Sequence, residues 1–125
     1  MEFRDDTPKN KNGLTRIWNA FLYSLEGISA AFRHETAFRQ EVLLALILVP
    51  TALLLPVNGT GKAIMLASVL LVLIVELVNS AIEAAVDRIS PEYHLLAKRA
   101  KDFGSAAVLV SLISVPLIWA LVLFG

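Results

Sequence analysis

The sequence predicts an all-α membrane protein in which one amphipathic helix lies on the membrane surface and three helices cross the bilayer. The first observation is composition, because 57% of the 125 residues are hydrophobic, more than a water-soluble domain of this size carries. The second is that these residues gather in three long apolar stretches after residue 41. The third is a helical spacing of apolar residues in the segment that precedes them.

The N-terminal part of the chain predicts a lead-in followed by the surface helix. Residues 1–13 are polar and contain proline and glycine, so we expect them to be disordered. Over residues 14–34 apolar side chains recur at intervals of three and four, which places them on one stripe. Trp18 and the phenylalanines of this stripe suit the boundary between water and lipid, and they favour a helix in the plane of the interface. A soluble helix packed on a partner is the alternative.

Three transmembrane spans are expected, over residues 42–57, 63–85 and 105–124. A helix needs about 20 residues to cross the hydrocarbon core. The purely apolar part of the second stretch ends at Val75, too early for a span, so its helix must continue through the polar residues that follow. With the surface helix, these spans form a single integral-membrane domain over residues 14–125.

The positions of lysine and arginine predict the orientation of the chain. Six of the eleven basic residues precede the first span, Lys62 alone lies between the first and second spans, and four lie between the second and third. Since cytoplasmic loops carry the excess of basic residues, we expect a cytoplasmic N-terminus and a C-terminus on the opposite side. Eleven acidic residues balance the basic ones, so the net charge gives no indication of nucleic-acid binding.

Five polar residues follow the apolar part of the second span. Glu76, Asn79, Ser80, Glu83 and Asp87 fall on one face of a helix, and the stripe runs about 16 Å along its axis. A carboxylate inside a bilayer costs several kcal/mol, so such groups usually face a protein interior or a wet cavity. The carboxylates are therefore predicted to be functional, whereas the amide and the hydroxyl have the alternative of hydrogen-bonding neighbouring helices.

Two further groups of charges lie near the expected cytoplasmic boundary. Glu35 and Glu41 precede the first span together with two arginines, and a solvated interfacial face is the alternative reading. After the second span, Ser90 and Pro91 favour a helix start, with the serine as N-cap.

The helix after this start carries a cluster of charges of both signs. Lys98 and Asp102 are spaced as an i, i+4 pair, with Lys101 beside the aspartate. A surface helix stabilised by ion pairs is one explanation. The other is a metal-bound polyphosphate, which needs carboxylates for magnesium and ammonium groups for phosphate oxygens.

Three blocks of the sequence resemble the signature blocks of the prokaryotic diacylglycerol kinase family. They are AAFRHETAFRQE, VELVNSAIEAAVDRI and EYHLLAKRAKDFGSAAVL, and they occur in the family's order and spacing. The resemblance implies a homotrimer in the bacterial cytoplasmic (inner) membrane. It also implies direct in-line transfer of the γ-phosphoryl group of ATP, with Mg²⁺, to the hydroxyl of diacylglycerol, giving phosphatidic acid.

The resemblance also implies a role for each matching residue. Glu76 would accept the proton of the lipid hydroxyl, and Glu35 and Glu83 would hold Mg²⁺. The other residues that would contact the nucleotide are Arg16, Tyr23, Glu92, Tyr93, His94, Lys101 and Asp102. The residues that would support the site or line its lipid side are Arg39, Glu41, Asn79, Asp87 and Ser105.

Two alternatives to this function stay open at the level of sequence. A branch of the same family phosphorylates undecaprenol, and the carboxylate and lysine residues would be common to both branches. A non-enzymatic membrane protein that uses the Glu76 stripe as a proton relay is the other alternative. Because three helices could hardly seal such a site from lipid, we expect an oligomer with active sites shared between neighbouring chains.

Overall fold

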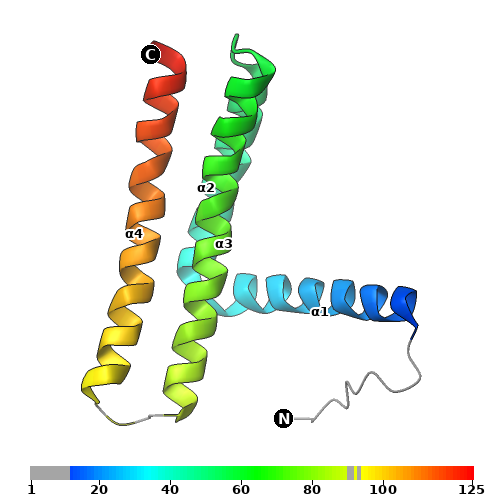
Figure 1. Ribbon diagram of the computed structural model, residues 1–125, viewed down its shortest axis with the longest axis vertical. Coiled ribbons are helices and arrows are strands. Elements are labelled where there is room, and N and C mark those ends of the chain that lie inside the picture. Colours follow the sequence, from blue (N-terminus) through cyan, green and yellow to red (C-terminus); the bar gives the residue numbers. More distant parts are fainter. Residues whose placement is uncertain (1–11, 90–91, 93) are drawn as a thin grey trace.

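The computed structural model describes residues 12–89, 92 and 94–125, and these residues form four helices. They are α1 (Gly13–His34), α2 (Thr36–Leu54), α3 (Gly59–Ile89) and α4 (Leu95–Phe124). Figure 1 shows α2, α3 and α4 running side by side along one direction, while α1 projects sideways from them. α3 packs against both α2 and α4, and α1 contacts only the neighbouring parts of α2 and α3. The predicted all-α architecture is confirmed.

The surface helix α1 begins where a side chain caps it. The Asn12 side chain accepts a hydrogen bond from the Thr15 backbone N–H at 2.8 Å, which satisfies one of the N–H groups left over at a helix start. Residues 1–11 of the expected lead-in lie outside the described residues. Within α1 only Ala31 is buried, and the apolar stripe stays exposed, with Trp18 59% accessible. A stripe that its own chain leaves uncovered is what a helix lying on a membrane requires.

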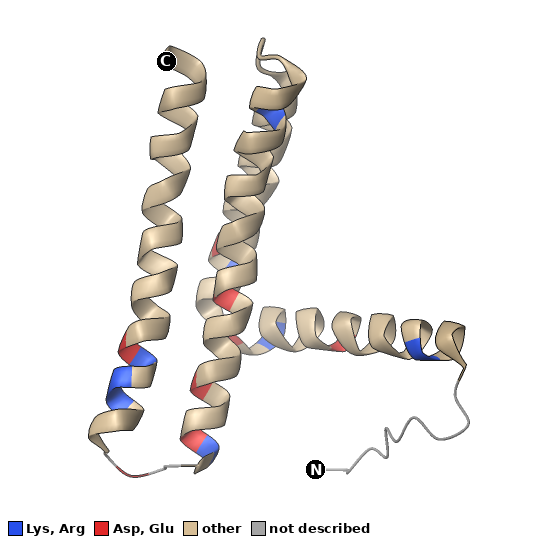
Figure 2. Cartoon of the chain, in the orientation of Figure 1, with Lys and Arg blue, Asp and Glu red and all other residues tan. Residues whose placement is uncertain are grey.

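Three of the described helices are long and apolar enough to cross a membrane, namely α2, α3 and α4. α3 has 31 residues and is therefore about 46 Å long, which exceeds the roughly 30 Å of a bilayer's hydrocarbon core. It continues without a break through Glu76, as the length argument predicts. Figure 2 shows that most charged residues gather in the half of the bundle from which α1 projects, with one basic residue near the opposite end. The polar end of α3 therefore extends toward this charged region.

The predicted start of the last helix is wrong. α4 begins at Leu95, and its N-cap is His94, whose Nδ1 accepts a hydrogen bond from the Leu96 N–H at 3.1 Å. Ser90 and Pro91, the expected cap and first helical residue, lie outside the described residues. An imidazole nitrogen supplies the acceptor that the serine hydroxyl was expected to supply.

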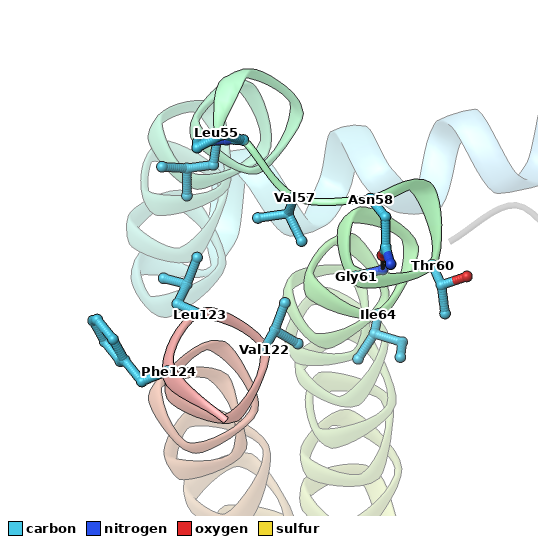
Figure 3. Close-up of a pocket in the computed structure, with 10 residues that line it drawn as sticks. Leu55, Val57, Asn58, Thr60, Gly61, Ile64, Val122, Leu123 and Phe124 are labelled. Atoms are coloured by element: carbon cyan, nitrogen blue, oxygen red, sulfur yellow. Dashed lines mark hydrogen bonds between the residues drawn. The ribbon is translucent and has the colours of Figure 1, made fainter.

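At the end of the bundle opposite the charges, a close approach requires a glycine. A Cβ atom on Gly61 would lie 2.3 Å from the Val57 side chain and 3.0 Å from that of Val122. The Asn58 side chain accepts a hydrogen bond from the Gly61 N–H at 2.8 Å and so caps α3. Figure 3 shows these residues around a mainly apolar pocket, with Phe124 at its rim. No carboxylate or amine lines this pocket, so we place the candidate site at the other end.

A tryptophan joins α3 and α4 in the apolar half of the bundle. Trp119 Nε1 donates to the Met65 carbonyl at 3.3 Å and to the Ser68 hydroxyl at 3.1 Å.

Hydrogen bonds between membrane helices are worth about 1 kcal/mol, so Trp119→Phe should lower the free energy of unfolding by about that amount. Unfolding in mixed detergent followed by circular dichroism measures the change. Ser114→Ala is the control, because within the described part of the chain that hydroxyl bonds only the Val110 carbonyl of its own helix. An equal loss in both variants would contradict the assignment.

Candidate functional site

The polar stripe of α3 passes from a buried end to an exposed end. Glu76 is only 5% exposed and Asn79 8%, Ser80 and Glu83 are half-buried, and Asp87 is exposed. The stripe therefore faces the other helices at its inner end and water at its outer end. This gradient connects the apolar half of the bundle with its charged end.

A second buried carboxylate lies beside the inner end of the stripe. Glu41 of α2 is 9% exposed, and its carboxylate interacts with that of Glu76 across the α2–α3 contact. Its Oε2 has no hydrogen-bond partner among the described residues. Glu76 also interacts electrostatically with Glu83 and Glu35. Carboxylates of α2, α3 and the α1–α2 junction thus each interact with Glu76, and a cation or a shared proton would relieve their repulsion.

Carboxylates around Glu76 are the donor type that Mg²⁺ prefers, and they fit an ion held jointly with a substrate. Among residues 12–89, 92 and 94–125, no three His, Cys, Asp or Glu side chains are close enough to form a complete metal site. Magnesium usually takes one or two protein carboxylates and completes its shell with water and substrate phosphates. Glu35 at the α1–α2 junction and Glu83 on α3 both interact electrostatically with Glu76, and they are the candidates for that partial coordination.

Asn79 links the stripe to α4. Its Nδ2 donates to Glu83 Oε1 at 3.3 Å, which orients one of the two candidate metal ligands. Its Oδ1 lies against Gly104, where a Cβ atom would come within 2.1 Å of that oxygen. Gly104 is buried, and only the lack of a side chain lets α4 approach this closely. Sequence reasoning missed this glycine, although a small residue beside a serine and two alanines in a membrane helix is a signal of close helix packing.

Two exposed ion pairs stand at the outer end of the stripe. Lys101 Nζ lies 2.7 Å from Asp87 Oδ1 and joins α4 to α3, and Lys98 Nζ lies 2.6 Å from Asp102 Oδ2 within α4. The predicted i, i+4 pair is therefore present. Lys101 pairs with the stripe rather than with the adjacent aspartate. The structure thus brings an ammonium group to the water-exposed end of the line of carboxylates.

The structure of one chain does not bring every predicted residue to this place. Arg16 and Tyr23 lie on α1, and about 27 Å of helix separates Arg16 from His34 at the end of that helix. Glu92 and Ser105 are exposed, the first before α4 and the second on it. His94 caps α4, and Tyr93 lies outside the described residues.

Arg39 lies at the junction of α1 and α2. Its Nη1 donates to the backbone carbonyls of Phe32 at 2.9 Å and Arg33 at 3.0 Å, and its Nη2 donates to the Thr36 hydroxyl at 3.1 Å. The guanidinium, expected on the lipid side of the site, thus binds the C-terminal end of the surface helix.

A family model and several individual proteins with similar sequences indicate the same family for this chain. The family model for prokaryotic diacylglycerol kinase matches residues 22–123. The chain is 56% identical over 117 residues to a diacylglycerol kinase of Pseudomonas aeruginosa, covering 94% of this chain and 95% of that relative. It is 49% identical over 116 residues to one of Escherichia coli K12, covering 93% and 95%. It is 41% identical over 114 residues to one of Helicobacter pylori 26695, covering 91% and 89%. The chain therefore belongs to the prokaryotic diacylglycerol kinase family, a family of lipid kinases.

Proposed function

We propose that this protein transfers the γ-phosphoryl group of ATP to the hydroxyl of diacylglycerol at the cytoplasmic side of a bacterial inner membrane. The observation that carries the proposal is the gradient along α3, from buried Glu76 to exposed Asp87 paired with Lys101. A lipid hydroxyl reaches the first end from the bilayer, and a water-soluble phosphoryl donor reaches the second end from the cytoplasm. The family and the names of the relatives support this pairing of substrates.

Glu76 is the proposed proton acceptor. A general base must lie within hydrogen-bond reach of the hydroxyl whose proton it takes, and Glu76 is the residue of the stripe that adjoins the apolar part of α3. As the hydroxyl oxygen bonds to the γ-phosphorus, its proton passes to the carboxylate and ADP leaves on the opposite side. No covalent enzyme intermediate is needed, because phosphoryl transfer depends mainly on in-line positioning and charge neutralisation.

The remaining residues bind and orient the substrates in this proposal. Glu35 and Glu83 hold Mg²⁺, which neutralises phosphate charge when it is bound. Lys101 and Asp102 contact the nucleotide at the exposed end. Arg16, Tyr23, Glu92, Tyr93 and His94 complete the nucleotide contacts. Asn79 and Asp87 support the site, and Glu41 and Ser105 belong to its lipid side.

The position of the α1 residues supports the homotrimer with shared sites that the family resemblance implies. Arg16 is carried away from Glu76 along α1, so it contributes to nucleotide binding most simply in the site of a neighbouring chain. The concentration of lysine and arginine in the half of the bundle that bears α1 supports a cytoplasmic N-terminus, with the C-terminus across the membrane.

A two-substrate assay tests the proposed function. The purified protein in mixed micelles with MgATP should convert diacylglycerol to phosphatidic acid efficiently and phosphorylate undecaprenol poorly. Labelled γ-phosphate recovered in each lipid measures both reactions. Preferential turnover of undecaprenol would move the protein to the other branch of the family, and turnover of neither lipid would contradict a kinase.

A further inference from the structure

The only non-helical residue between α1 and α2 is Glu35. It ends α1, with its N–H bonded to the Ala31 carbonyl at 2.9 Å, and it precedes α2 with an extended backbone at φ −114° and ψ 108°. The direction of α1 relative to α2 is therefore decided at this residue, and Figure 1 shows the two helices meeting there in a sharp elbow. Any change in the elbow also moves the Glu35 side chain.

One side chain spans this elbow. Arg39 stands in the first turn of α2, and its guanidinium reaches back over Glu35 to the Phe32 and Arg33 carbonyls. Those carbonyls belong to the last turn of α1, where a helix leaves acceptors without partners and where a positive charge meets the negative end of the helix dipole. A second nitrogen of the same guanidinium binds the Thr36 hydroxyl at 3.1 Å. The guanidinium thus bonds to the end of α1 and to the start of α2 at the same time.

We propose that Arg39 is a positioning residue that locks the α1–α2 elbow and thereby aims the Glu35 carboxylate at α3. Glu35 lines one pocket together with Ser80 and Ala81 of α3, so the locked elbow keeps it beside the stripe. The inference rests on the proposed function in one respect only, that Glu35 binds Mg²⁺ with ATP. It assigns Arg39 an intramolecular role in place of a direct contact with lipid.

Two substitutions of Arg39 distinguish the effect of its hydrogen-bonding geometry from the effect of its positive charge. Arg39→Met removes the donors and keeps the aliphatic length, whereas Arg39→Lys keeps the charge and loses the forked geometry. Arg33→Met is the matched control. It removes the same charge at the same membrane boundary, but among the described residues the Arg33 side chain bonds only the Ser29 carbonyl of its own helix, at 3.4 Å.

The first measurement tests the geometry of the elbow and does not depend on kinase activity. The chain contains no cysteine, so single cysteines at the exposed positions Ala20 on α1 and Ala85 on α3 accept spin labels cleanly. With labelled protein diluted in unlabelled protein, the inter-label distance distribution should be narrow in the parent protein and after Arg33→Met. It should broaden strongly after Arg39→Met and by less after Arg39→Lys. An unchanged distribution in Arg39→Met overturns the inference.

The second measurement tests whether Glu35 is held in position to bind Mg²⁺. The Mg²⁺ concentration that gives half-maximal rate should rise about tenfold in Arg39→Met, as it does when a metal ligand loses a supporting partner. It should stay at the parent value in Arg33→Met. Equal increases in the two variants would mean that the Mg²⁺ requirement depends only on the surface charge that both variants lose. This result would also overturn the inference. If the parent protein phosphorylated no lipid, the proposed function would fail while the spin-label comparison still tested the elbow.

Discussion

Replacing Glu76 with glutamine should reduce lipid phosphorylation by 10²-fold to 10⁴-fold or more, the range associated with loss of a general base. The amide has nearly the same shape as the carboxylate and keeps one acceptor oxygen, but it cannot take up the proton of the lipid hydroxyl. The packing around this buried side chain should therefore survive. The rate of phosphatidic acid formation measures the effect, and circular dichroism and the oligomer size in detergent show that the protein still folds and assembles.

The chain offers a matched control for this substitution. Glu26 lies exposed on α1, outside the proposed site, and Glu26→Gln removes the same charge. That variant should keep most of the parent rate. An active Glu76→Gln protein would remove the assignment of the base, and an unfolded one would instead point to a structural role for the carboxylate.

Replacing Gly104 with alanine should destabilise the α3–α4 contact by about 1–3 kcal/mol, the usual effect of overpacking a close contact. The added Cβ would lie 2.1 Å from Asn79 Oδ1, so either the amide or α4 must move. Because the same amide donates to Glu83, its displacement should also raise the Mg²⁺ requirement. Unfolding in mixed detergent measures the first effect, and the Mg²⁺ dependence of the rate measures the second.

A double substitution tests whether Asn79 is the cause. In Asn79→Ala protein the two nearest atoms are absent, and the remaining Cβ is 3.8 Å away, an ordinary contact. Gly104→Ala should then cost little further stability, while activity stays low because Glu83 has lost its partner. Gly27→Ala is the control, since nothing lies within 4 Å of its added Cβ. An equal loss of stability from Gly104→Ala with and without Asn79 would contradict the contact.

Local patterns made the surface helix and the stripe on α3 predictable. The intervals of three and four in residues 14–34 require only helical geometry, and the structure has α1 over Gly13–His34. The N-cap expected at Ser90 was wrong, and local patterns explain this as well. Several residues of a loop can cap a helix, and the sequence does not determine which one the preceding chain brings into position. The structure uses His94.

The sequence by itself determined the membrane class, the surface helix and the one-sided line of carboxylates, because these depend on composition and on periodicity within one segment. Only the tertiary structure decided which side chains meet. It set Glu41 beside Glu76, Asn79 against Gly104, and Lys101 in an ion pair with Asp87. These contacts depend on the distance and register between helices, which side-chain packing sets across segments that are far apart in the chain.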